Sequence, residues 1–121
     1  MTMKFLNMTE TVFEKETLKS DYRQSNKIGR VGIGESILYF KNKMKINYMP
    51  FAEIYRAFRR IKAVPARIGS ARSEIRLEFL VLCSKKDEIA EIDLPDENAS
   101  NAIIEEIQKK NPDLKIGKKK D

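Results

Sequence analysis

The chain has 121 residues, the length of a single domain, with 41% apolar residues, 35% charged residues and a formal net charge of +6. It contains no histidine and one cysteine, which argues against imidazole-based catalysis, thiolate–imidazole metal sites and an internal disulfide. The longest uncharged apolar run covers only residues 79–83 and no signal peptide begins the chain, so we expect a cytoplasmic protein without a transmembrane segment and without a cofactor.

The first 24 residues are interpreted as an N-terminal extension that contains a short helix. Thr11 is followed three residues later by Glu14, which is the spacing of a capping box. We therefore expect a helix over residues 11–22. Its apolar stripe is poor, so the helix is predicted mainly from its start signal.

A period of two replaces the helical pattern after this extension. Residues 28–33 alternate loosely and predict a first strand, although glycines interrupt it. Residues 37–40 are apolar and aromatic and predict a second strand. The polar stretch 41–43 predicts a tight turn into a third strand over 44–48, and proline then opens a one-turn element over 50–54.

The middle of the chain predicts a hairpin of two longer strands. Residues 55–64 form the first strand, residues 65–73 a loop, and residues 74–84 the returning strand. The returning strand alternates polar and apolar residues in its first half and is apolar throughout its second half, which indicates cover on both faces there. A turn over 85–87 leads into another alternating strand over 88–94.

The last third of the chain carries the clearest helical pattern. Residues 96–110 place Ile103 and Ile107 on one apolar stripe, with acids toward the start and lysines at the end, as the helix dipole favours. A short strand over 114–116 is expected to follow it. Residues 118–121 are interpreted as a basic tail.

Two segments resemble motifs of small bacterial proteins with a pleckstrin-homology-like (PH-like) domain. Residues 48–60, YMPFAEIYRAFRR, resemble the junction between the third strand and the following long strand in that group. Residues 107–117, IQKKNPDLKIG, resemble its helix exit and terminus. The resemblance covers about residues 25–118, although Phe51 and Phe58 stand where that group often has tyrosine. The group has no assigned biochemical role.

This resemblance implies a mainly β (α+β) fold. We expect an antiparallel PH-like barrel or sandwich of about six to seven strands over residues 25–117, with a C-terminal helix that plugs one open end. Ile103 and Ile107 would then cover an apolar interior. The expected interior side chains are Ile37, Tyr39, Ile46, Phe58, Leu77, Phe79 and Val81.

Residues 55–76 hold seven cations against a single acid, Glu74, a surplus equal to the net charge of the whole protein. Most of these cations are arginines, which bind phosphate and carboxylate groups through two parallel hydrogen bonds. The predicted surface for an anion or partner comprises Arg56, Arg59, Arg60, Lys62, Arg67, Arg72 and Arg76. The alternative is a solvated face that keeps an edge strand unpaired.

No spacing of nucleophile, base or metal ligand argues for an enzyme. We therefore expect a non-enzymatic interaction module that binds a protein segment or an anionic group through the basic hairpin. The alternatives are weak binding to nucleic acid or an anionic membrane, and a homo-oligomeric structural protein. Nucleic acid is disfavoured because, of the two aromatic residues among the arginines, Tyr55 and Phe58, the second is expected to face the core.

Two further features are given structural interpretations. Lipid-binding PH domains carry basic residues on an early hairpin, whereas the turn expected here, residues 34–36, holds an acid and no cation. This argues against phosphoinositide binding at the usual surface. Cys83 lies in an apolar strand and is expected to be an unreactive core residue.

Overall fold

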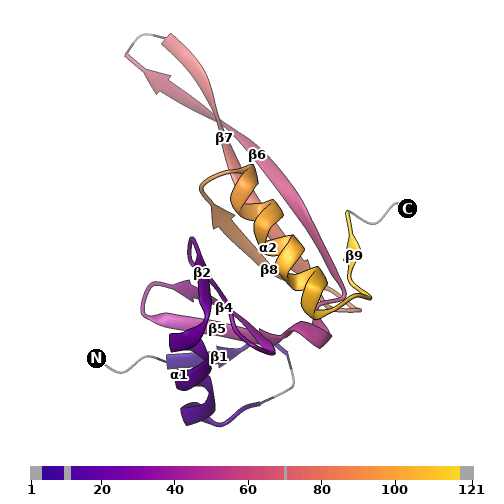
Figure 1. The fold of residues 1–121 in the computed structure, drawn as a ribbon. Helices are drawn as coiled ribbons and strands as arrows, with labels where there is room; N and C mark the ends of the chain where they lie inside the picture. Colours follow the sequence, from indigo (N-terminus) through magenta and orange to yellow (C-terminus); the bar gives the residue numbers. More distant parts are fainter. Residues whose placement is uncertain (1–3, 10–11, 70, 118–121) are drawn as a thin grey trace.

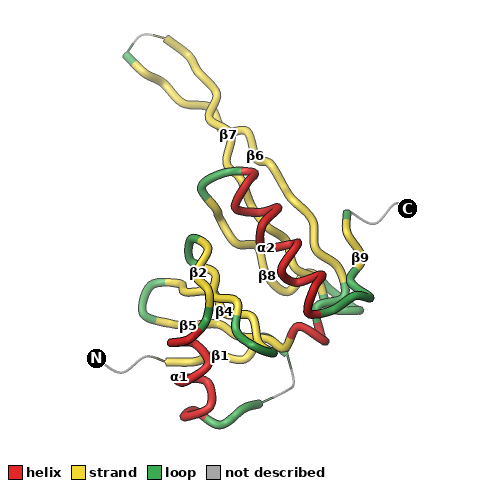
Figure 2. The backbone as a smooth tube through the Cα atoms, viewed as in Figure 1, coloured by secondary structure: helices red, strands yellow, loops and turns green. Residues whose placement is uncertain are grey.

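The computed structural model describes residues 4–9, 12–69 and 71–117. They form an α+β fold in which two mixed sheets, of five and four strands, pack with two α-helices and one 3-10 helix (Figure 1; Figure 2). The elements are β1 (Lys4–Asn7), α1 (Lys15–Gln24), β2 (Asn26–Ile28), β3 (Val31–Ile33), β4 (Ile37–Asn42), β5 (Lys45–Pro50), η1 (Phe51–Glu53), β6 (Arg56–Ile68), β7 (Ala71–Cys83), β8 (Glu88–Leu94), α2 (Glu97–Lys110) and β9 (Lys115–Ile116). The α+β class and the C-terminal helix are confirmed, but the described strands do not close into a barrel. No described helix is long and apolar enough to cross a membrane.

The five-stranded sheet has the order β1-β5-β4-β3-β2, in which β2 to β5 form an antiparallel meander and β1 runs parallel to β5. The prediction of a single strand over 28–33 was wrong, because the chain turns at Gly29 and Arg30 and forms the β2–β3 hairpin. Gly29 has φ +60°, a left-handed conformation that glycine adopts without steric cost. The next hairpin turns at Lys43 and Met44, slightly later than predicted.

The four-stranded sheet has the order β8-β7-β6-β9 and contains the longest hairpin of the fold. The loop predicted over 65–73 was wrong: β6 continues to Ile68 and β7 begins at Ala71, with Gly69 left-handed between them. The Gly117 N–H donates to the Ala57 carbonyl, so odd-numbered β6 residues direct their backbone polar groups away from β7. Pro65 shares this parity, and its missing N–H therefore removes no bond from the ladder.

The helix predicted over residues 96–110 is present as α2, and it packs against both sheets instead of plugging a barrel (Figure 1). The Asp96 side chain caps it by accepting a 2.9 Å hydrogen bond from the Ala99 N–H, and Lys109 and Lys110 lie in its last turn. Ile103 and Ile107 are fully buried in the main core. This core also contains Leu38 and Met49 of the five-stranded sheet, and Leu80, Leu82 and Ile92 of the four-stranded sheet.

Part of the predicted interior was wrong. Leu77 is exposed, and Ile37, Tyr39 and Ile46 are buried in a separate core under α1 and not beneath α2. Phe58 and Val81 are buried, but they and Phe79 lie on the face of the hairpin opposite to Leu80 and Leu82, which pack in the α2 core. The end of β7 is apolar on both faces, so its period could not indicate which face α2 covers.

A second core lies on the other side of the five-stranded sheet, under α1. Leu18 of α1 packs there with Tyr39 and with Ile37, Ile46 and Tyr48. The helix begins and ends later than predicted, at Lys15 and Gln24, and the expected cap at Thr11 lies outside the described residues. Strand β1 was not predicted, because residues 4–7 show no period of their own and are placed by pairing with β5.

Candidate functional site

The basic hairpin has two parts with different surroundings. We call residues 56–60 and 78–83 the base, because β8, β9 and α2 lie against it. We call residues 61–69 and 71–77 the arm. Strand β8 pairs with β7 only as far as Glu78, and the arm projects beyond it as a two-stranded ribbon (Figure 1; Figure 2).

On the α2 side of the base, Arg59 is neutralised by acids. Its Nε and Nη2 donate to the two carboxylate oxygens of Glu78 at 2.7 and 2.8 Å, and Glu97 lies 3.3 Å away. The buried Ser100 hydroxyl donates a third hydrogen bond to Glu78 at 2.7 Å. The Arg59 guanidinium, helped by this hydroxyl, lowers the pKa of Glu78. This cluster fastens the first turn of α2 to the hairpin.

On the opposite face of the hairpin, Arg60 of the base and Lys62 at the start of the arm are also paired. Arg60 donates to Glu88 at 2.6 Å and to Glu91 at 2.7 Å, and Lys62 donates to Glu91 at 2.6 Å. Hydrogen bonds from Lys62 and Arg60 lower the pKa of Glu91. Arg60 also lies over the ring of Phe58, with 5.5 Å between the guanidinium carbon and the ring centroid. This network of ion pairs therefore helps to cover apolar side chains.

Arg56 has a structural role as well. Its guanidinium donates a 2.8 Å hydrogen bond to the carbonyl of Gly117, next to the two-residue pairing of β9 with β6. Four of the seven predicted site residues are thus engaged within the chain.

The three remaining cations, Arg67, Arg72 and Arg76, lie on the arm and are exposed. Within the described ranges, no ion pair or hydrogen bond joins their side chains to another residue. Arg67 and Arg72 are directly opposite each other in the β6–β7 register. Like charges at such a position destabilise a strand pair, unless a bound anion lies between them.

A second cationic surface, which the sequence analysis missed, lies at the two turns of the five-stranded sheet. We call it the turn hollow. It has a volume of about 400 Å³ and is lined by Tyr22, Lys27, Gly29, Arg30, Lys41 and Lys43. Tyr22 comes from α1, the β2–β3 hairpin supplies Lys27, Gly29 and Arg30, and the β4–β5 hairpin adds the other two. The cations on either side of Gly29 were a usable signal, hidden by the prediction of one continuous strand.

Two of the cations in the turn hollow are held in place. The Lys27 ammonium donates to the Tyr22 carbonyl at 2.6 Å and to the Ser25 hydroxyl at 2.7 Å, and burial lowers its pKa. Arg30 pairs with Asp93 at 3.0 Å. Lys41 and Lys43 are exposed, and no ion pair joins them to other described residues.

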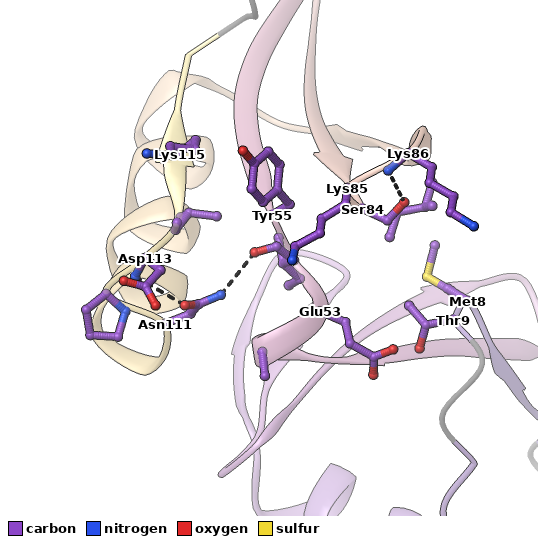
Figure 3. A pocket seen from close by; sticks show the side chains of 15 residues that line it. Met8, Thr9, Glu53, Tyr55, Ser84, Lys85, Lys86, Asn111, Asp113 and Lys115 are labelled. Atoms are coloured by element: carbon purple, nitrogen blue, oxygen red, sulfur yellow. Dashed lines mark hydrogen bonds between the residues drawn. The ribbon is translucent and has the colours of Figure 1, made fainter.

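A cavity of about 1070 Å³ lies where η1, the β7–β8 turn and the end of α2 meet (Figure 3). Its charges are mixed, with Lys85, Lys86 and Lys115 near Glu53 and Asp113. The Asn111 amide that lines it donates to the Phe51 and Ile54 carbonyls at 2.9 and 3.0 Å, which ties the end of α2 to η1. This cleft therefore shows no selectivity for one sign of charge.

A family model described as "Domain of unknown function (DUF6709)" matches residues 2–121. The chain belongs to this family. Searches of curated proteins and of solved structures found no match.

Cys83 was predicted to be a core residue, but it is only partly buried, at the end of β7 in this DUF6709 domain. Its burial, followed by the nearby charge of Glu88, raises the pKa of the thiol. A raised pKa lowers the fraction of reactive thiolate at neutral pH.

Proposed function

We propose that this domain is a non-enzymatic interaction module that binds an anionic partner through the arm of the basic hairpin. The observation that carries the proposal is that, within the described structure, acids neutralise two arginines of the base but not those of the arm. Acids of β7, β8 and α2 pair with the arginines at 59 and 60, whereas Arg67, Arg72 and Arg76 have no such partner among the described residues. Arginines that are exposed and opposed are a favourable arrangement for gripping a phosphate or carboxylate.

The shape of the arm supports the same proposal. A two-stranded ribbon is at most marginally stable in water when no further strand or helix packs against it. Along the arm, β6 and β7 pair only with each other among the described residues. A ribbon of this kind contributes little to the core, and it is well placed to be ordered by a partner.

The arrangement of strands is in keeping with a PH-like module. Strands β2 to β5 form one antiparallel meander, β6 to β8 form a second, and α2 follows and packs against both sheets. PH-like domains share this order of strands followed by one C-terminal helix. Because such folds serve many functions, the arrangement supports a module of this class and leaves the ligand to the side chains.

The test is retention on immobilised heparin, a polyanion, as a function of salt concentration. We expect Arg67→Gln/Arg72→Gln to elute at clearly lower salt than the wild-type protein, because electrostatic binding depends on the number of cations engaged. The control is Lys15→Gln/Arg23→Gln on α1, which removes the same net charge from exposed positions. Equal losses in the two double variants would mean that only net charge matters, and would contradict the proposal.

The turn hollow supports a second candidate function, the binding of a small anion such as a phosphate group. Four cations converge there, Lys27 and Arg30 from the β2–β3 hairpin and Lys41 and Lys43 from the β4–β5 hairpin, and no acid is among the described residues that line the cavity. The early hairpin is also where lipid-binding PH domains carry basic residues. The argument from residues 34–36 against this surface no longer applies, because the first turn lies at Gly29 and Arg30.

Inorganic phosphate is a suitable probe of the hollow. We expect phosphate, compared with chloride at equal ionic strength, to raise the thermal stability of the wild-type protein. Lys41→Gln/Lys43→Gln should lose most of this gain, and Arg67→Gln/Arg72→Gln should keep it. A gain that survives the lysine substitutions would exclude the hollow as the site.

A further inference from the structure

The two faces of the arm differ in chemistry. This difference specifies the kind of anionic partner, in an inference that rests on the proposed function. Alternation along the paired strands puts Arg67, Arg72 and Arg76 on one face, together with Glu74, Ala63, Pro65 and Ile61, which is 51% exposed. The other face carries Val64, Ala66, Ser73, Ile75 and Leu77, with Lys62 as its only charge among the described side chains. Most of the charge of the arm therefore lies on the first face, whereas the second face is mainly apolar.

The apolar face is exposed to solvent. Ile75 is 46% exposed and Leu77 is 40% exposed, although most large apolar side chains of the other strands are buried. The side chains of Arg60 and Lys62, which are held by ion pairs, lie over the neighbouring Phe58 and Phe79 rings. Ile75 is paired with Val64 and lies two residues from Leu77 on the same face, and neighbouring exposed apolar side chains favour a contact site.

We propose that the arm binds the surface of an anionic lipid bilayer. With the ribbon lying in the membrane plane, Ile75, Leu77 and Val64 enter the boundary between headgroups and acyl chains. The opposite face then holds Arg67, Arg72 and Arg76 at the level of the lipid phosphates. Amphipathic elements with a cationic face and an apolar face bind membranes in this way, by apolar burial together with attraction to anionic lipids.

Both faces together favour a bilayer over the other partners. A nucleic acid would engage the arginines and leave Ile75 and Leu77 in water. A second copy of the chain packed on the apolar face would leave Arg67 and Arg72 opposed without an anion. The backbone edges of the arm limit how deeply it enters the bilayer, because unpaired N–H and C=O groups cannot enter the hydrocarbon core without partners. The ribbon therefore stays at the interface, where water and headgroups satisfy those groups.

The first experiment is co-sedimentation with vesicles of phosphatidylcholine alone or mixed with phosphatidylglycerol. We expect binding only to the mixed vesicles, about fivefold weaker for each arm arginine replaced by glutamine. Ile75→Ser/Leu77→Ser should weaken binding on the order of tenfold, because it removes the apolar contribution. The matched controls are Lys15→Gln/Arg23→Gln for charge and Val12→Ser for an apolar residue that is 73% exposed outside the arm.

The second experiment measures penetration with a fluorescent reporter. The chain has no tryptophan, so Leu77→Trp supplies a single probe on the apolar face. We expect its emission to shift to the blue on mixed vesicles and to be quenched by lipids brominated in their acyl chains. The matched control is Val12→Trp, which should show neither effect.

Three outcomes would overturn the inference, and they separate it from the proposed function. Binding to mixed vesicles without a shift or quenching of the Leu77→Trp emission would mean electrostatic adsorption alone. Arginine-dependent retention on heparin without binding to vesicles would leave the anionic partner in place and exclude the bilayer. If Arg67→Gln/Arg72→Gln kept both its heparin binding and its vesicle binding, the arm would be excluded as the binding surface.

Discussion

The base and the arm of the basic hairpin are built from the same two strands and a similar set of residues, yet they are different surfaces. At the base, Arg59 and Arg60 meet acids from β7, β8 and α2 at hydrogen-bonding distance. On the arm, Arg67 and Arg72 face each other across the strand pair. The comparison shows that the charge of a segment does not define a binding surface. The neighbouring elements decide which of its charges are used within the fold.

The largest expected effect compares two leucines of β7. Leu80 at the base is fully buried under α2, and Leu77 on the arm is exposed. We expect Leu80→Ala to lower the free energy of unfolding by about 2–5 kcal/mol, because it leaves a cavity in a packed core. Leu77→Ala should change it by less than about 0.5 kcal/mol. Urea denaturation measures both, and similar losses would show that the arm is packed in solution.

A smaller effect compares two glutamates on the same face of β7. Glu78 accepts hydrogen bonds from Arg59 and Ser100, whereas no ion pair joins Glu74 to another described residue. We expect Glu78→Gln to lower stability by about 1.5–3 kcal/mol at neutral pH, the range for hydrogen bonds to charged groups. Glu74→Gln should stay within about 0.5 kcal/mol.

The effect at Glu78 should depend on pH. Because the folded-state pKa of Glu78 is lowered from its ordinary value of 4.5, its contribution is fully present above that value. It is lost as the pH falls through the lowered pKa of the folded state. The difference between the wild-type protein and Glu78→Gln should therefore shrink in acid, as measured by urea denaturation at several pH values. A difference that grows in acid would contradict this assignment.

The smallest effect concerns the opposed arginines. Arg67→Gln removes the repulsion with Arg72 and should stabilise the arm by about 0.2–1 kcal/mol at low salt. High salt screens the repulsion in the wild-type protein and should remove the difference. Amide hydrogen exchange of the arm residues of β6 and β7 is the local measurement, with slower exchange expected in the variant. Faster exchange would mean that Arg67 has a stabilising partner.

The candidate site was predictable in composition and only partly in position. The sequence located the seven cations, but Glu78, Glu88, Glu91 and Glu97 neutralise part of them from segments up to 38 positions away, as in the Arg59–Glu97 pair. Such pairing depends on strand register and on where α2 docks. The turn hollow was missed for a related reason. In the sequence, Gly29 is interpreted as an unfavourable residue within one strand. The pairing of Asn26 with Ile33 shows that it lies in a turn.

The sequence by itself determined the elements whose signals are local. The α2 helix followed from its apolar period and its acids and lysines, and most strands followed from their alternation. The tertiary structure alone decided which face of β7 the helix covers, that β1 joins β5, and that the sheets do not close into a barrel. The physical reason is that hydrophobic burial has no direction. An apolar run predicts that its side chains are buried, but only the tertiary structure shows which element packs against them.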